Sequence, residues 1–100
     1  MRRGTTPTHT FNTNIDLSDA AVLYVTYKQG NEVMMEKAID DCVISADKVV
    51  VHLSQAETLA FQSYAGQVDM QIRARFPDGS AVASNIMTVA AGKILKDGEI

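Results

Sequence analysis

The sequence has no tryptophan, one cysteine and two prolines among its 100 residues. A single cysteine excludes an intramolecular disulfide, and with it the small secreted domains that disulfides hold together. No apolar run approaches the ~20 residues of a membrane-spanning helix. Nine basic residues against twelve acidic ones give a net charge of −3, which disfavours a nucleic-acid-binding protein. These absences favour a small soluble domain that binds neither nucleic acid nor membrane.

The chain has enough apolar material for one folded domain, since 46% of its residues are hydrophobic. We expect residues 1–7 to form a mobile N-terminal arm, residues 8–95 to form one domain and residues 96–100 to form a tail. The polar stretch that follows Arg2 and Arg3 does not have the apolar core of a secretory signal. We therefore expect synthesis in the cytoplasm without export.

Apolar and polar residues alternate over Val68–Phe76, a period of two that is typical of a half-buried strand. The segment Pro77–Gly79 predicts a turn, and Ala81–Val89 predicts the second strand of an antiparallel hairpin. Further strands are predicted at residues 8–15, 22–27, 32–38, 42–44 and 49–53. About seven short strands favour an all-β antiparallel sandwich with immunoglobulin-like topology, and this is the fold class that we expect.

Two single-turn helical segments are expected between the strands. Ser54 followed by Glu57 forms a capping-box pattern, which predicts a helical turn at this point. A similar brief turn is expected over residues 16–20.

The hairpin between the second and third predicted strands has two candidate registers. A two-residue loop at Gly30-Asn31 would place Glu36 opposite Val25, among core residues. A three-residue loop instead brings Val33 and Met35 to the inward face. We expect the three-residue loop, because it keeps the carboxylate out of the core.

The expected core consists of apolar residues at inward positions. They are Leu23, Val25, Tyr27, Val33, Met35, Val49, Val51, Leu53, Leu59, Phe61, Val68, Met70, Ile72 and Phe76.

Residues that could carry chemistry are few and scattered. His9 and His52 have no acidic or cysteine partner at the spacing of a metal-ligand set. Cys42 lies in an apolar run, where a small buried side chain is its usual role. No nucleophile elbow or phosphate-binding loop is present. We therefore expect no catalytic residue, no metal site and no cofactor, and we expect that the protein is not an enzyme.

The most distinctive polar surface contains Arg73 and Arg75, which share one face of a predicted strand with Gln71. The ordinary interpretation is a solvated outer face of a sheet. Arginine is also enriched where proteins meet, because its planar guanidinium binds carboxylates with two hydrogen bonds. Met34 is expected on the same outer face as an exposed apolar residue. Met34, Gln71, Arg73 and Arg75 are thus a candidate protein-contact surface, and strand edges offer a second route to partners, including self-association.

Several segments, in this order and spacing, carry a resemblance over nearly the whole chain: Arg3–Thr8, Leu53–Phe61, Gln71–Arg73, Asp78–Gly79, Ala83–Ile86 and Ile94–Gly98. Together they resemble a family of small proteins encoded in prophages of Gram-positive gut bacteria. That family has no assigned activity and is similar to the immunoglobulin-like N-terminal domain of phage baseplate upper proteins. The resemblance implies a structural or adaptor protein of a phage tail or baseplate, with other phage structural proteins as partners and the virion as its destination.

A different function also fits the residues. Sandwich domains host many glycan-binding sites, and phages attach to cell walls. The aromatic side chains available for such a site are Phe11, Tyr24 and Tyr64. A small glycan-binding module for host attachment is therefore the alternative.

Overall fold

The structure is a computed structural model, and it describes residues 1–63 and 66–100. In these ranges the chain forms eight strands, one short α-helix and one 3-10 helix. In chain order they are β1 Thr8–Asn12, β2 Val22–Gln29, β3 Glu32–Ala38, η1 Ile39–Asp41, β4 Cys42–Ile44, β5 Lys48–His52, α1 Gln55–Leu59, β6 Gln67–Arg75, β7 Ala81–Ala83 and β8 Met87–Ala90.

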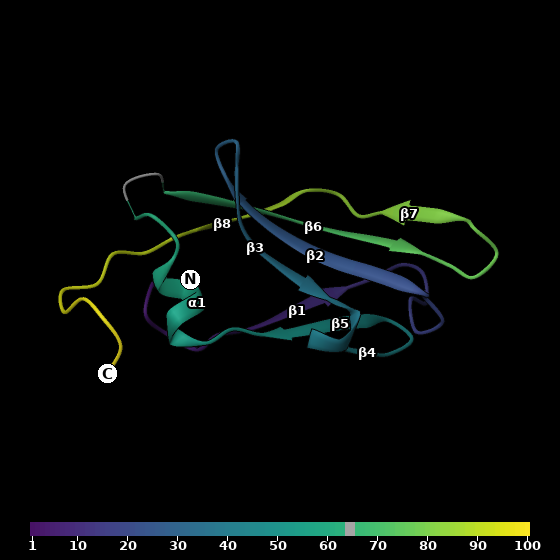
Figure 1. The fold of residues 1–100 in the computed structure, drawn as a ribbon, viewed down its shortest axis with the longest axis horizontal. Helices are drawn as coiled ribbons and strands as arrows, with labels where there is room; N and C mark the ends of the chain where they lie inside the picture. Colours follow the sequence, from purple (N-terminus) through teal and green to yellow (C-terminus); the bar gives the residue numbers. More distant parts are fainter. Residues whose placement is uncertain (64–65) are drawn as a thin grey trace.

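The strands form two layers of antiparallel sheet (Figure 1). One sheet has three strands in the order β1-β5-β4, and the other has β3-β2-β6 with both β7 and β8 paired to β6. This order matches strands B-E-D and C′-C-F-G of the immunoglobulin-like topology, with the last strand divided between β7 and β8. In the described ranges no strand corresponds to the first one. The all-β sandwich expected from the sequence is confirmed.

The second arm of the last hairpin is two strands rather than the single expected one, which raises the count to eight. β7 pairs with residues 73–75 and β8 with residues 67–70 of β6. Between them, the Ser84 amide donates to the Ile72 carbonyl at 2.9 Å, and the Ile72 amide donates to the Ser84 hydroxyl at 3.0 Å. The Ser84 hydroxyl thus accepts the hydrogen bond that a backbone carbonyl would accept in a regular strand. The second arm is therefore interrupted between β7 and β8, while Ile72 of β6 keeps its hydrogen bonds.

The core lies between the two sheets, and the central strands β2 and β6 supply half of it. Its buried apolar residues are Phe11, Leu17, Leu23, Val25, Tyr27, Val49, Val51, Leu53, Phe61, Val68, Met70, Ile72, Ala74 and Ala91. Four of the expected core residues are not fully buried: Val33 is exposed, and Met35, Leu59 and Phe76 are half-buried. Phe76 lies beyond the end of β6 at the turn, where only one sheet can cover it.

The turn between β2 and β3 corrects the expected register. Gln29 pairs with Glu32, so the loop contains two residues, Gly30 and Asn31, rather than three. Gly30 has a φ of +59°, and among residues 1–63 and 66–100 no residue other than glycine has a positive φ. A positive φ at the first central position alone is typical of a type II′ turn, which matches the twist of the flanking strands.

A bulge at Met34 resolves the conflict that had favoured the longer loop. Lys28 pairs with Val33 and Tyr27 pairs with Met35, which leaves Met34 without a partner. The extra residue moves Glu36 to a position opposite the outward-facing residue 26, away from the core. The same shift leaves Val33 at the exposed end of the hairpin, 54% accessible to solvent.

Residues 1–7, which we expected to form a mobile arm, are attached to the domain. Arg2 forms a parallel bridge with Gly92, and the Arg3 amide donates to the Gly92 carbonyl at 3.1 Å. The Arg3 guanidinium donates to the carbonyls of Leu59, at 2.8 Å, and Phe61. Arginine thereby satisfies carbonyls at the end of α1 that have no partner inside the helix. Polar composition alone did not reveal these partners.

Thr58 holds the same arm from within α1. Its side chain is fully buried. The Thr5 amide donates to the Thr58 hydroxyl at 3.0 Å, and this hydroxyl donates to the Thr5 carbonyl at 2.8 Å. The backbone of Gly4 lies close to the side chains of Ile94 and Leu59. Its φ is +69°, a value that other residues rarely adopt. The arm is therefore packed between α1 and the C-terminal segment.

The helix α1 begins as the capping-box pattern predicts. The Glu57 amide donates to the Ser54 hydroxyl at 3.2 Å, and the Ser54 amide donates to the Glu57 carboxylate at 2.8 Å. The expected turn at residues 16–20 is a single hydrogen-bonded turn, in which Ala20 donates to Leu17 at 3.1 Å. The 3-10 helix η1 was not expected from the sequence.

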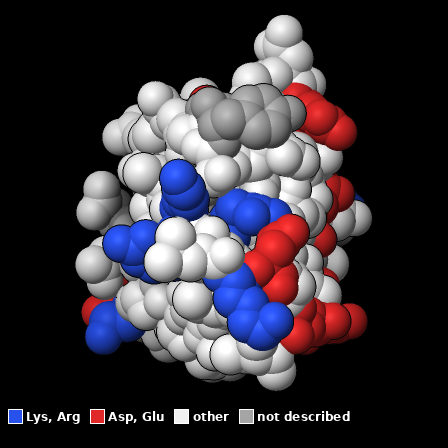
Figure 2. All heavy atoms as spheres, turned by 90° about the vertical axis from the view of Figure 1, so that its left-hand side faces the viewer, with Lys and Arg blue, Asp and Glu red and all other residues white. Residues whose placement is uncertain are grey.

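The end of the sandwich that contains α1 and both termini carries charges of both signs. Figure 2 shows basic side chains at its centre and acidic ones along one side. The Lys37 ammonium lies 2.5 Å from the Glu57 carboxylate, and the Arg3 guanidinium lies 3.6 Å from Asp97. The charges at this end are thus mixed rather than gathered into a patch of one sign.

Candidate functional site

The outer face of the five-stranded sheet brings together most of the polar residues that the sequence singles out. Across β2 and β6, Tyr24 pairs with Arg73 and Thr26 pairs with Gln71. Arg75 follows on the same face, one pair further along β6. We call these five residues the arginine face. Its position follows from the period of two in both strands, because residues two apart point to the same side.

A shallow hollow of about 300 Å³ lies on the arginine face. Tyr24, which is 42% exposed, Arg73 and Arg75 line it together with Glu36 from β3 and Ala81 from β7. Alanine is opposite both arginines on β7, so the short side chains leave the guanidinium groups uncovered on that side. The hollow is thus basic, with one aromatic ring beside the charges.

Both arginines of this face are exposed. Ion pairs in the described part of the chain involve Arg3 and Lys37 but neither Arg73 nor Arg75. The nearby Glu36 instead accepts a hydrogen bond from Thr26, at 3.2 Å. The two guanidinium groups therefore retain their donors for carboxylates of another molecule.

The structure separates Met34 from the other candidate contact residues. Met34 is the bulge residue of β3, is half-buried and packs against the core, so it is not the exposed apolar residue that we expected. Gln71 stays on the arginine face, and its amide donates to the Ser84 carbonyl at 2.9 Å. Gln71 thus supports the β7–β8 connection, and Arg73 and Arg75 remain as the contact residues of the original set.

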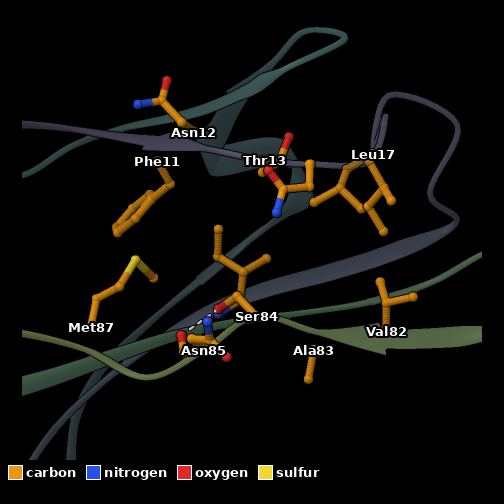
Figure 3. A pocket seen from close by; sticks show the side chains of 12 residues that line it. Phe11, Asn12, Thr13, Leu17, Val82, Ala83, Ser84, Asn85 and Met87 are labelled. Carbon is orange, nitrogen blue, oxygen red and sulfur yellow. Dashed lines mark hydrogen bonds between the residues drawn. The ribbon is translucent and has the colours of Figure 1, made fainter.

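A second concave feature, which we call the apolar groove, lies between β1 and the β7–β8 connection. It has a volume of about 490 Å³. Its lining is Phe11, Asn12, Thr13, Asn14, Ile15, Leu17, Ile72, Val82, Ala83, Ser84, Asn85 and Met87. Figure 3 shows Phe11, Leu17, Val82 and Met87 pointing into the space between the two sheets. The groove therefore opens where an immunoglobulin-like sandwich has its first strand.

The groove also contains a buried polar atom. The hydroxyl oxygen of Thr13 is buried and has no hydrogen-bond partner within residues 1–63 and 66–100. The Thr13 amide, in contrast, continues the β1–β5 ladder by donating to Asp47 at 2.8 Å. An unpaired buried hydroxyl is uncommon and destabilising, so this atom is available to a group that enters the groove. Sequence reasoning missed the groove because its wall comes from β7 and β8, which were expected as one continuous strand.

Each histidine contacts a hydroxyl group: His9 of β1 reaches Tyr27 of the other sheet, and His52 of β5 reaches Thr8 of the adjacent strand β1. Nδ1 of His9 lies 2.8 Å from the Tyr27 hydroxyl, and Nδ1 of His52 lies 2.7 Å from the Thr8 hydroxyl. Burial, with a smaller contribution from the N-terminal charge, lowers the pKa of His9. Burial also raises the pKa of Tyr27, so the phenol remains protonated.

Cys42 is half-buried at the start of β4 and donates to the Ala38 carbonyl, with the sulfur at 3.4 Å. Burial and the charge of Asp41 raise the pKa of the Cys42 thiol, although Lys37 opposes them. The thiol is therefore the favoured form at neutral pH, and the thiol is a poor nucleophile. The environment agrees with a small packing residue.

Comparison with known proteins identifies no relative: no family model, no curated protein and no solved structure matches the chain. Among the residues that the structure describes, no helix has the length and apolar character needed to cross a membrane. In the same ranges, no three histidine, cysteine or acidic side chains are grouped as metal ligands would be. The arginine face and the apolar groove are therefore interpreted from their own chemistry.

Proposed function

We propose that this chain is a non-catalytic adaptor that works through protein–protein contacts, with the arginine face as its contact surface. The observation that carries the proposal is the pair of exposed guanidinium groups of Arg73 and Arg75, which form no ion pair within the described residues, beside the exposed ring of Tyr24. Arginine and tyrosine are the residues that most often dominate the energy of protein interfaces. A partner segment that carries carboxylates suits this surface.

We place this adaptor in a phage particle, in the tail or baseplate, with other phage structural proteins as its partners. The support is the resemblance carried by segments such as Arg3–Thr8 and Leu53–Phe61 to small prophage-encoded proteins. The sandwich fold by itself supports no particular function, because sandwich domains serve many unrelated ones.

Mass spectrometry of purified particles from an induced lysogen tests the location. We expect the chain in the particles at a fixed ratio to the tail proteins. A variant lysogen that makes no tails serves as the control, because a contaminant would still sediment with its heads. Absence of the chain from intact particles would contradict the placement.

Charge reversal tests the contact surface. The double variant Arg73→Glu, Arg75→Glu should lose chemical cross-links to particle proteins, since the partner's carboxylates then meet like charges. The matched control is Lys48→Glu, Lys93→Glu, which changes the net charge equally at exposed positions away from the arginine face. Equal cross-linking of the two double variants would remove the arginine face from the proposal.

Glycan binding is the second candidate, and Tyr24 is the observation that favours it. An exposed aromatic ring with charged neighbours in a hollow is a common way to hold a sugar ring. Phe11 is excluded from this role because it is buried, with 6% of its surface exposed, and Tyr64 lies outside the described residues. Saturable binding to cell-wall polysaccharide that Tyr24→Ala abolishes would favour this function over the adaptor.

A further inference from the structure

The edges of the two sheets are unequally protected. The edge strand β3 has a bulge at Met34 and carries charged side chains, and β4, β7 and β8 contain at most four residues each. β1 has five residues in a regular register, and no charged residue occurs from Gly4 to Ile15. Charges, bulges and short lengths are the usual devices that keep edge strands from pairing with other chains. Within the described ranges, β1 is the edge that lacks all three.

The outer side of β1 presents a defined set of backbone groups. The Thr13 amide donates to the Asp47 carbonyl, and the Leu53 amide donates to the Pro7 carbonyl. The backbone amides and carbonyls of the odd-numbered residues in this segment therefore point toward β5. Hydrogen-bonding direction alternates along an antiparallel strand. The amides and carbonyls of Thr8, Thr10 and Asn12 therefore point toward the free edge.

From this geometry we propose that β1 pairs with β1 of a second copy of this chain, in antiparallel orientation about a two-fold axis at Thr10. Thr10 then lies opposite Thr10 of the second copy, and Thr8 opposite Asn12. Each of these pairs exchanges two backbone hydrogen bonds, because both members point their groups outward. The result is one continuous sheet with the strand order β4-β5-β1-β1-β5-β4. Isologous pairing of this kind forms a closed dimer.

The side chains on the outer face suit a second copy. Val43 pairs with Val50, and Val50 pairs with Thr10, so a row of β-branched, uncharged residues leads across the sheet to the edge. The two-fold axis places the same row of the second copy directly beside it, with Thr10 next to Thr10. A neutral edge on a chain with a net charge of −3 lets two copies approach without placing like charges against each other.

The apolar groove lies alongside the proposed interface. In the same register, Pro7 of the second copy is opposite Thr13, because both residues continue the ladder with β5. Ile15 is 47% exposed at the groove, and the buried hydroxyl of Thr13 has no hydrogen-bond partner among the described residues. Pro7 of one copy thus lies at the end of the groove in the other copy, beside Thr13.

Light scattering coupled to size exclusion, from about 1 μM to about 1 mM, tests the pairing over the range of weak and moderate dimers. We expect the unaltered chain to dimerise. Thr10→Lys places two ammonium groups side by side at the axis and should weaken the dimer about tenfold or more. Thr10→Val retains the β-branched shape and is the matched control, which should dimerise as the unaltered chain does. Thermal unfolding of Thr10→Lys verifies that its monomer is intact, since the Thr10 side chain is exposed.

Mixing the variants Thr10→Lys and Thr10→Glu tests the register itself. Each alone should be mainly monomeric, while an equimolar mixture should form a heterodimer because opposite charges then meet at the axis. A monomeric unaltered chain at the highest concentration, or a Thr10→Lys dimer as tight as the control, would overturn the pairing. Failure of the mixture to dimerise would overturn the two-fold axis at Thr10. None of these outcomes depends on the arginine face, so the dimer and the adaptor function are tested separately.

Discussion

The two sheets of the sandwich differ in how much they contribute to the core and in the charge of their outer faces. The five-stranded sheet provides half of the buried apolar residues from β2 and β6 alone: Leu23, Val25, Tyr27, Val68, Met70, Ile72 and Ala74. Its outer face is the charged arginine face. The three-stranded sheet provides Phe11, Val49 and Val51 to the core, and its outer face and its edge β1 are largely uncharged. The larger sheet is therefore the structural frame, and the smaller one is held against it.

This division shows how one small fold can support two kinds of contact. A charged face selects a partner of complementary charge, because like charges disfavour all others. A neutral strand edge pairs through backbone groups that every chain possesses, so its selectivity must come from shape and register. Substitutions in each sheet test this difference, and the largest effect is expected at Ile72, in the middle of β6.

Ile72→Asp should abolish folding. Ile72 is buried at the centre of β6, opposite Val25, where a carboxylate has no partner. An unpaired buried charge together with the lost apolar contacts should destabilise the chain by more than about 4 kcal/mol, a large part of the stability of a small domain. Circular dichroism and urea unfolding measure the effect. Arg75→Asp introduces the same side chain on the opposite face and should fold cooperatively; cooperative folding of Ile72→Asp instead would place Ile72 outside the core.

The alternation that identifies Ile72 explains why the sequence predicts the frame well. A strand buried on one face has a period of two, and β6 keeps it over its full length. The three-stranded sheet was harder to predict, because β4 has three residues and β1 ends at Asn12 instead of Ile15. Short strands contain too few residues for a period to be distinguished from chance.

Thr58→Val should have the next largest effect, on the connection between the sheets. The substitution keeps the shape of the side chain but removes the hydroxyl that bonds the Thr5 amide and carbonyl. The two backbone groups of a packed segment then lack a partner, which should reduce the free energy of unfolding by about 1–3 kcal/mol. Urea unfolding measures the loss, and hydrogen exchange of the Thr5 amide should accelerate. Thr6→Val, at an exposed position, is the control; slow exchange at Thr5 in Thr58→Val would show that the arm is held by other contacts.

Gly30→Ala should have a smaller effect, limited to the protected edge of the larger sheet. A Cβ atom at Gly30 would meet no neighbouring atom, so the change acts only through the backbone φ of +59°. Alanine at a positive φ should destabilise the chain by about 1 kcal/mol. Thermal unfolding measures this shift. An unchanged midpoint for Gly30→Ala would argue against the two-residue turn.

The candidate contact surface was predictable in part. Two residues apart on one strand, Arg73 and Arg75 had to share a face, and the structure places them so. Met34 could not be placed correctly, because it is itself the extra residue of a bulge, and a bulge leaves no mark in the spacing of the sequence. The position of Tyr24 beside Arg73 depends on the pairing of β2 with β6, and the position of Glu36 at the hollow depends on the bulged register of β2 with β3. Surfaces built within one strand are thus predictable, whereas surfaces built across strands require the pairing.

The smallest effect should be a pH dependence that links the two sheets through His9 of β1 and Tyr27 of β2. The pKa of His9 is lowered in the folded chain from an unfolded value of about 6.5, mainly by burial. The folded chain therefore binds fewer protons than the unfolded chain near this pH, and its stability rises with pH. We expect the stabilisation to be complete above about pH 6.5 and to be lost as the pH falls through the folded pKa of His9.

Urea unfolding between pH 5 and pH 8 measures this dependence, with His9→Gln as the test variant. Glutamine cannot titrate, so the variant should have a flatter profile over the interval in which His9 gains its proton. The same slope in His9→Gln and in the unaltered chain would assign the dependence to another group. Because His9 also lies next to the free edge of β1, dimerisation should be compared at the two ends of this interval. A dimer that persists at pH 5 while the monomer is destabilised would show that the edge pairs through its backbone groups and does not depend on the charge state of the smaller sheet.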